Sequence, residues 1–106
     1  MTVYLVRHGE TEWSRTRRHT GRTDVPLTPR GRIQAGMLTG TLDHLAPDRV
    51  LTSPLSRARD TATLAGYGDA IEEPRLLEWD YGDVEGRTTE EIRTEEPGWS
   101  VWSHPI

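Results

Sequence analysis

Short apolar segments alternate with strong helix-start signals along this chain, and this alternation limits the possible folds more than any other feature. Residues 2–7, 49–52 and 70–72 are apolar segments of the length expected for short buried strands. Thr28-Pro29 and Ser53-Pro54 each place a capping hydroxyl before a proline, which suits the first turn of a helix. Strand, helix, strand, helix, strand is the order of an α/β fold with a mainly parallel sheet.

The remaining segments complete this prediction. The apolar spacing predicts one helix over residues 28–46 and another over residues 53–66. Their expected buried faces carry Ala35, Leu38, Leu42, Leu45, Leu55, Ala58, Ala62 and Ala65. Residues 14–27 are predicted to form a loop, and Leu76-Leu77 a further strand. A capping box at Thr88 to Glu91 predicts a short helix that extends to about residue 95.

The composition limits the size and the class of the protein. A chain of 106 residues allows a single domain, which we take over residues 1–106. Leu, Ile and Val contribute only 20 of these residues, so the hydrophobic core is expected to be thin. The sequence contains no cysteine, which excludes disulfides and thiolate chemistry. Without a signal peptide or a long apolar segment, we expect a cytoplasmic protein that does not bind membranes.

The charge is unevenly distributed between the two parts of the chain. Residues 1–60 hold 10 Arg against 6 acidic residues, whereas residues 61–106 hold 3 Arg against 11. The basic first part suggests an anionic ligand. The sequence pI of about 5.5 argues against a nucleic-acid partner. The Arg cluster at residues 15–18 lacks interleaved aromatic residues, so it favours a solvated or phosphate-facing loop.

The first candidate residues lie at the end of the first predicted strand. In open α/β sheets, ligands bind beyond the carboxyl ends of the strands, where Arg7, His8 and Gly9 are expected. Arg7 could hold an anion with two parallel hydrogen bonds. A neutral His8 imidazole could attack phosphorus and become phosphorylated. The alternative is an ordinary loop histidine beside a surface arginine.

Two further candidates follow later strands. Ser53-Pro54 ends the second predicted strand, and Arg57 lies one turn into the next helix, where it could point back toward the same crevice. Glu78 follows the predicted Leu76-Leu77 strand and could protonate a leaving oxygen. The alternatives are a solvated Arg57 and a surface Glu78. The sequence contains no nucleotide-binding glycine motif and no zinc motif, and its four histidines lack metal-ligand spacing, so we predict neither a metal nor a cofactor.

Four segments, taken together and in this order, resemble the histidine phosphatase superfamily and its phosphoglycerate-mutase-like branch. These segments are Leu5 to Thr11, Thr20 to Thr28, Thr52 to Ala58 and Leu77 to Gly82. The resemblance implies a three-layer α/β/α fold with a mainly parallel sheet. It also implies a phosphoenzyme mechanism that acts on a small phosphorylated metabolite.

The resemblance also implies roles for individual residues. His8 matches the nucleophile, Arg7 and Arg57 match the clamp on the phosphoryl oxygens, and Glu78 matches the proton donor to the leaving alkoxide. Three residues would line the phosphate and substrate loop: Ser14, where many relatives carry Asn, Thr20 and Gly21. Asp80 and Tyr81 would border the substrate side.

One expected element of the family is missing from this sequence. The family pocket contains a second histidine near the end of a much longer chain, and His104, with only two residues after it, does not match that position. We therefore expect the N-terminal portion of an incomplete fold, with a sheet edge that could pair with a second copy or with the absent C-terminal half.

The substrate and the reaction class stay open at this level. The residues at 20–24 and 78–82 look most similar to those of sugar-bisphosphatase and acid phosphatase members. The sequence predicts hydrolysis of a phosphate monoester, for example a sugar phosphate. The alternatives are a phosphoglycerate mutase and an inactive phosphate-binding fragment.

Overall fold

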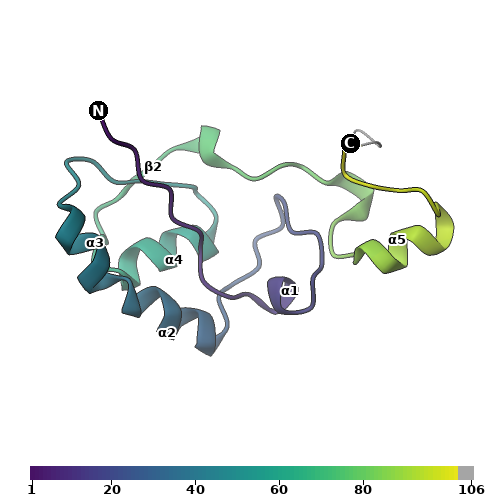
Figure 1. Cartoon of the computed structure of the whole chain (residues 1–106), viewed down its shortest axis with the longest axis horizontal. Helices are drawn as coiled ribbons and strands as arrows, with labels where there is room; N and C mark the ends of the chain where they lie inside the picture. Colours follow the sequence, from purple (N-terminus) through teal and green to yellow (C-terminus); the bar gives the residue numbers. More distant parts are fainter. Residues whose placement is uncertain (103–106) are drawn as a thin grey trace.

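In the computed structural model, which describes residues 1–102, α-helices accompany a small parallel sheet (Figure 1). The elements in chain order are α1 (Glu12–Arg15), α2 (Pro29–Met37), α3 (Thr39–Leu45), β1 (Leu51–Thr52), α4 (Ser56–Leu64), β2 (Ile71–Glu72), the 3₁₀ turns η1 (Pro74–Leu76) and η2 (Gly82–Val84), and α5 (Thr89–Glu95). Strands β1 and β2 pair in parallel, with Leu51 opposite Ile71 and Thr52 opposite Glu72. The predicted mixture of helices and parallel sheet is confirmed.

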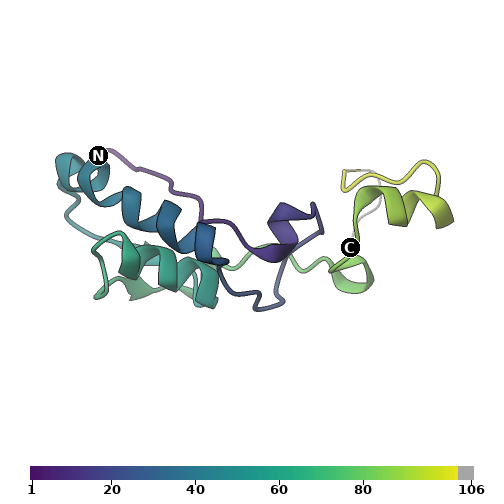
Figure 2. The same cartoon turned by 90° about the horizontal axis from the view of Figure 1, so that it is seen from below.

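The described part of the chain is elongated, with extents of 47 × 30 × 19 Å. Helices α2, α3 and α4 gather at one end with the sheet, and α5 lies at the other end (Figures 1 and 2). Helix α2 packs on α4, and α4 packs on β1. The buried apolar side chains are few, as the composition predicts: Val25, Leu27, Ala35, Ala65, Ile92 and Trp99. No helix within residues 1–102 is long and apolar enough to cross a membrane.

Two helix starts follow the predicted capping rule. The Thr28 hydroxyl accepts from the Gly31 N–H at 3.0 Å with Pro29 at the first helical position, and the Thr88 hydroxyl accepts from the Glu91 N–H at 3.1 Å. The helix over residues 28–46 is not continuous. It is interrupted at Leu38, where the Thr39 hydroxyl donates to the Gly36 carbonyl at 2.9 Å.

The helix predicted from Ser53 begins later, at Ser56. Both the backbone N–H and the hydroxyl of Ser56 donate to the Asp24 carboxylate, at 2.9 and 2.7 Å. A residue 32 positions away thus supplies the cap that we expected from Ser53. The predicted face of this helix is also rotated, because Arg57, Thr61 and Ala65 are its buried residues while Ala58 and Ala62 are half-buried.

Two predicted strands are wrong. Residues 2–7 belong to no strand, and their side chains are exposed, with Leu5 at 93%. A strand needs a hydrogen-bonded neighbour, and the sheet within residues 1–102 consists of β1 and β2 alone. Leu76-Leu77 is not a strand either, because Pro74 and the Glu73 carboxylate, which accepts from the Arg75 N–H, begin the turn η1.

The predicted loop over residues 14–27 also needs a correction at its start. Helix α1 reaches Arg15, and Thr11 and Ser14 form a reciprocal capping box at its N-terminus. The segment before α1 passes close to α2, because Gly9 and Gly31 approach so closely that a Cβ atom on Gly9 would overlap the Gly31 carbonyl. The contact brings residue 9, and therefore His8, to the N-terminal end of α2.

Candidate active site

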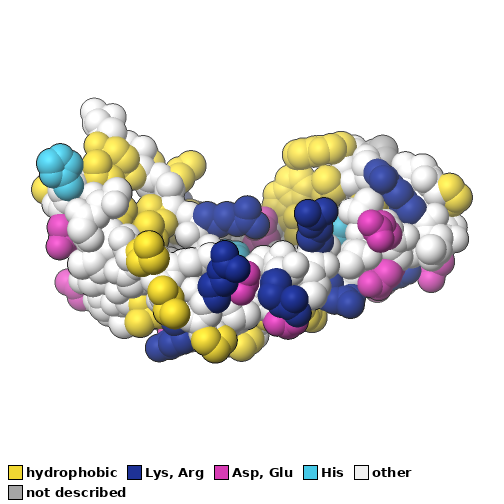
Figure 3. Space-filling model, turned by 60° about the horizontal axis from the view of Figure 1, so that its bottom comes forward, with side chains coloured by type: hydrophobic (Ala, Val, Ile, Leu, Met, Phe, Trp, Pro, Cys, Tyr) yellow, Lys and Arg dark blue, Asp and Glu magenta, His cyan; other side chains and the backbone are white. Residues whose placement is uncertain are grey.

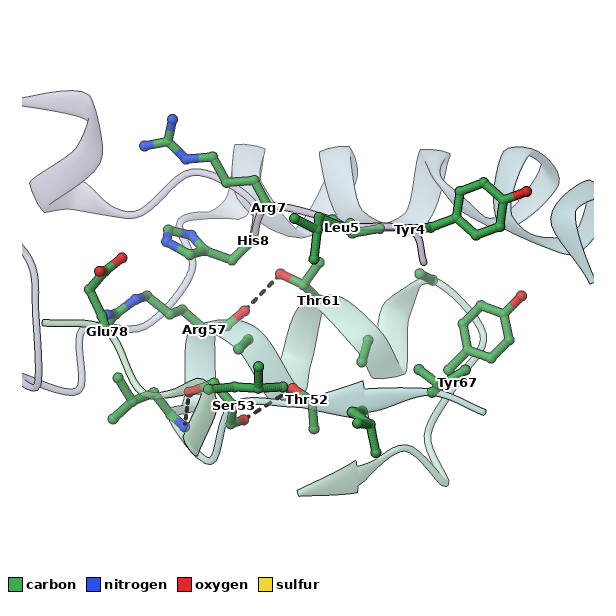
Figure 4. A pocket seen from close by; sticks show the side chains of 18 of the residues that line it. Tyr4, Leu5, Arg7, His8, Thr52, Ser53, Arg57, Thr61, Tyr67 and Glu78 are labelled. Atoms are coloured by element: carbon green, nitrogen blue, oxygen red, sulfur yellow. Dashed lines mark hydrogen bonds between the residues drawn. The ribbon is translucent and has the colours of Figure 1, made fainter. Parts of the chain in front are cut away.

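His8, Arg7, Arg57 and Glu78 meet at one end of an open cleft (Figure 4). The cleft has a volume of about 1470 Å³ and is lined by residues 1–8 on one side and by residues 46–53 on the other. The space-filling view shows the hollow in the middle of the molecule, with arginine side chains gathered around it (Figure 3). The cleft therefore brings Arg7 and His8 together with Arg57 and Glu78, which lie 49 to 71 positions later in the sequence.

His8 is held in one tautomer by its own neighbour. Its Nδ1 lies 2.7 Å from the Gly9 carbonyl oxygen, and because a carbonyl only accepts, Nδ1 carries the proton. The lone pair of a neutral imidazole is then on Nε2. Burial is the main cause that lowers the His8 pKa below 6.5; Arg57 and Arg7 lower it further, while the Gly9 bond and Glu78 act to raise it. His8 thus presents an unprotonated Nε2 beside positive charge.

Arg57 is the most firmly held side chain at the site. It is 3% exposed, and its guanidinium donates to the Gly21 carbonyl at 2.6 Å and to the Thr23 carbonyl at 2.8 Å. Burial lowers its pKa from the ordinary value, while Glu78, Asp24 and Glu85 act to raise it. An arginine stays charged in proteins, so a fixed positive charge faces His8. Arg59, two positions along, is exposed.

Thr61 connects the backbone beside His8 to α4, and its role was not predicted from the sequence. Its hydroxyl accepts from the Gly9 N–H at 3.1 Å and donates to the Arg57 carbonyl at 2.7 Å. Residues 57 and 61 are one helical turn apart and share a face. The spacing of four residues between Arg57 and Thr61 could have indicated this role. A polar side chain one helical turn after a candidate anion-binding residue can reach the same neighbouring segment, here the one at Gly9.

Arg7 and Glu78 are more exposed than the other two residues. The Arg7 side chain extends over the cleft near His8, and Glu78 faces both His8 and Arg57 (Figure 4). One Glu78 oxygen accepts from the Trp79 N–H at 3.0 Å. Glu78 is therefore near the predicted place, although it follows an irregular segment rather than a strand.

Only some of the other predicted residues line the cleft. Ser14, Thr20 and Tyr81 line the cleft, and Tyr81 packs edge-to-face on His19 with ring centroids 5.2 Å apart. Gly21 is buried beneath the site and presents its carbonyl to Arg57. Asp80 does not line the cleft, and its carboxylate accepts from the Gly82 N–H at 3.0 Å. His104 lies outside the described residues.

Positive charge, rather than metal ligands, characterises the cleft. Arg17, Arg18 and Arg49 line it together with Arg7 and Arg57. Within residues 1–102, no group of three or more His, Asp or Glu side chains is placed to hold a metal ion. The arrangement can bind an anion beside a neutral histidine.

Comparison with known proteins connects this geometry to relatives. An acid phosphatase from Mycobacterium tuberculosis is 52% identical over 105 residues, which cover 96% of this chain and 51% of the relative. A probable phosphoglycerate mutase GpmB from Cronobacter sakazakii is 41% identical over 93% of this chain and 47% of the relative. The chain spans about half the length of the curated relatives that it matches.

Solved structures agree with the sequence relatives. The product of open reading frame Rv3214 from Mycobacterium tuberculosis matches with a TM-score of 0.83 and 49% identity, over 92% of this chain and 51% of that one. Mycobacterial glucosyl-3-phosphoglycerate phosphatase Rv2419c, described in complexes with VO₃, matches with a TM-score of 0.80 and 34% identity, over 86% of this chain and 47% of that one. The predicted phosphoglycerate-mutase-like fold is confirmed, and this chain represents about half of it.

The family model for the histidine phosphatase superfamily (branch 1) matches residues 3–105. This range includes all the residues that converge at the cleft. The chain therefore belongs to the histidine phosphatase superfamily.

Proposed function

We propose that the protein containing this chain hydrolyses a small phosphate monoester through a phosphorylated His8. The observation that carries this proposal is the convergence of a neutral His8 Nε2 with the Arg7 and Arg57 guanidinium groups and the Glu78 carboxyl group (Figure 4). Two positive charges beside a nitrogen nucleophile suit an incoming phosphoryl group. Positioning and electrostatic stabilisation are the main tasks of an enzyme that transfers such a group.

The chemistry follows in two balanced steps. His8 Nε2 attacks phosphorus, the bond from phosphorus to the ester oxygen breaks, and Glu78 gives the leaving oxygen a proton. Water then attacks the phosphohistidine, the phosphorus–nitrogen bond breaks, and Glu78 takes a proton from that water. Arg7 and Arg57 would hold the phosphoryl oxygens in both steps. Ser14, Thr20 and Tyr81, which line the cleft, would contact the rest of the substrate.

The names of the relatives support a phosphate ester as the substrate class. They include an acid phosphatase, a glucosyl-3-phosphoglycerate phosphatase, and a phosphoserine phosphatase from Entamoeba histolytica described in complex with 3-phosphoglyceric acid. The last two names each refer to a phosphate carried by a small organic molecule. A small phosphorylated metabolite is therefore the class that we propose.

Turnover of p-nitrophenyl phosphate tests this proposal. The assay uses the 106-residue chain and a hybrid in which this chain replaces the matching half of the 52% identical acid phosphatase. We expect the hybrid to release phosphate, and His8→Ala to reduce that release to background. The unaltered relative and the exposed-site variant Arg59→Ala serve as controls. A His8→Ala hybrid with near-parental turnover would show that the mechanism is wrong.

Mutase activity is the second candidate, because several relatives are probable phosphoglycerate mutases. A mutase returns the phosphoryl group to the substrate, whereas a phosphatase gives it to water. Incubation of the hybrid with 3-phosphoglycerate and 2,3-bisphosphoglycerate separates the two. Net phosphate release without isomerisation supports the phosphatase, and isomerisation without release supports the mutase.

A third candidate concerns the 106-residue chain by itself. We propose that it binds phosphate without turnover, because no histidine in this sequence matches the second histidine of the family pocket. Residues 2–7 and β1 line opposite sides of the cleft and do not pair with each other. Another strand between these edges would complete a sheet, and it could come from a second copy or from the half of the family domain that this chain does not span. Calorimetry with phosphate tests the binding, and light scattering of the chain tests the second copy.

A further inference from the structure

Glu85 is an acidic residue that the mechanism does not use, yet it contacts the loop beneath the site. One carboxylate oxygen, Oε1, accepts from the Gly21 N–H at 3.2 Å, from the Thr23 N–H at 2.9 Å and from the Thr23 hydroxyl at 2.7 Å. The partners are more than 60 positions away in the sequence. A carboxylate with several such donors is a fixed structural group rather than a solvated surface charge.

Gly21 and Thr23, which donate their N–H groups to Glu85, also bind Arg57 through their carbonyl groups. The Gly21 and Thr23 carbonyls accept from the Arg57 guanidinium at 2.6 and 2.8 Å. Glu85 therefore holds the N–H groups of residues 21 and 23, and Arg57 is held by their carbonyl groups. Since Arg57 is 3% exposed, the position of these two carbonyls determines where its guanidinium lies.

Short backbone contacts of the two residues that follow Glu85 keep it in place. The Gly86 N–H donates to the His19 carbonyl at 2.9 Å, and the His19 N–H donates to the Arg87 carbonyl at 2.9 Å. Gly86 has a φ of +77°, and a Cβ atom there would lie 3.0 Å from the Trp13 ring. The segment that carries Glu85 is thus bonded directly to the segment that leads into the loop at residues 20–24.

The electrostatics of Glu85 agree with this role. Burial acts to raise its pKa, but the hydrogen bonds from Thr23, Gly21 and Arg22 together hold the pKa below the ordinary value. Glu85 is therefore ionised at neutral pH, and its charge acts on Arg57. Within the described residues the carboxylate makes no ion pair with the guanidinium, so the two groups are connected through the backbone of residues 21 and 23.

We propose that Glu85 is a positioning residue for the anion site, which fixes the Arg57 guanidinium opposite His8 through the backbone of residues 21–23. The inference rests on the proposed function, because it assumes that Arg57 binds the phosphoryl group. Glu85 itself does not contact the substrate. Its removal should weaken phosphate binding without removing a charge from the cleft.

Titration of the full chain with inorganic phosphate, followed by calorimetry, tests the proposal. Glu85→Ala should weaken binding about tenfold, since one poorly placed charge-assisted contact is worth about 1.4 kcal/mol. Glu85→Gln keeps an acceptor oxygen and should recover most of the affinity. Asp83→Ala, an exposed acidic neighbour, is the matched control and should bind like the wild type.

A double variant separates positioning from general loosening of the fold. If Glu85 acts through Arg57, Glu85→Ala should not weaken phosphate binding further in an Arg57→Ala background. A second loss of similar size in that background would overturn the proposal, as would wild-type affinity in Glu85→Ala. If Glu85→Ala does not fold, as judged by circular dichroism, Thr23→Ala removes one of the three bonds and should weaken binding about threefold.

Failure of the proposed function gives a different result. If the wild-type chain does not bind phosphate, the anion site itself is wrong, and the variants cannot differ from it. If the wild-type chain binds phosphate and Arg57→Ala does not, while Glu85→Ala binds normally, the site stands and only the role of Glu85 is rejected.

Discussion

The two sides of the cleft differ in how many hydrogen bonds hold them to the rest of the chain. On the Arg57 side, a polar loop, a helix start and the segment at residues 85–88 are joined by short hydrogen bonds between residues far apart in sequence. On the other side, residues 2–7 are apolar, extended and exposed, with Val3 at 70% and Leu5 at 93%. The residues proposed to bind the anion are therefore held by contacts within residues 1–102, whereas residues 2–7 have no strand partner among them.

This difference has a physical basis. Side-chain carboxylates and guanidinium groups can satisfy backbone groups of a nearby loop one by one, so a site can form around a few residues. A strand edge presents a row of N–H and C=O groups that only another strand can satisfy together. His8 lies between the hydrogen-bonded loop region and the unpaired segment. The residue after it, Gly9, donates its N–H to Thr61, and the residues before it are the exposed segment 2–7.

The largest effect should follow the loss of Arg57. Arg57→Ala removes two hydrogen bonds to the loop carbonyls and leaves a space in α4, so the free energy of unfolding should fall by about 2–4 kcal/mol. Arg59→Ala, in the same helix but exposed, should change it by less than about 0.5 kcal/mol. Urea unfolding measures both variants. Equal effects would mean that the Arg57 side is not held as described.

A smaller effect should follow the loss of the cap on α4. Asp24→Ala removes the acceptor of the Ser56 N–H and hydroxyl, and should cost about 1 kcal/mol. The hydrogen bonds from Ser56 lower the Asp24 pKa, so the contribution of Asp24 is present above the ordinary pKa and is lost as the pH falls through the lowered value. The free energies of unfolding of the wild type and of Asp24→Ala should therefore become equal at acidic pH. A difference that persists below pH 2 would contradict this assignment.

The smallest effect on stability should occur on the open side. Leu5→Asp changes an exposed side chain and should shift the free energy of unfolding of the chain by less than about 0.5 kcal/mol. The same change should prevent an added strand from covering this edge, because it would bury a charge. Light scattering or complementation by the C-terminal half of the acid phosphatase relative measures that second effect. Ile33→Asp, an exposed residue of α2, is the control.

The sequence predicted the features that depend on neighbouring residues. The Thr28 and Thr88 caps and the β1 and β2 segments follow from local spacing. His8 and Arg57 lie near each other, but His8 does not follow a strand, so the rule for strand ends does not account for its position. The start of α4 could not be predicted in this way, because its cap comes from Asp24 in a distant loop.

Features that depend on contacts between residues far apart in the sequence were predicted less well. Residues 2–7 have the composition of a strand, but composition does not state whether a neighbouring strand is present. Thr61 was missed because its importance comes from the Gly9 N–H, which only the folded chain brings to it. The position of Asp80 outside the cleft has the same origin, since its carboxylate bonds locally to Gly82.

The lowered pKa of His8 makes the stability of the chain depend on pH. Because burial and the nearby arginines lower its pKa, the folded chain binds the proton less tightly than the unfolded chain does. The contribution of His8 to stability should therefore decline as the pH falls below 6.5, and level off below the folded pKa. The neutral form, which can accept a phosphoryl group, persists to more acidic pH than in an unperturbed histidine.

Nuclear magnetic resonance of the His8 ring during a pH titration, with and without phosphate, tests the central claim most directly. The His8 signal is assigned by its loss in His8→Ala. We predict a midpoint below 6.5 in the free chain, and a saturable upward shift with phosphate, because a bound anion favours the charged imidazole. Arg57→Ala should abolish that shift. A midpoint at or above 6.5 that phosphate does not move would contradict the account.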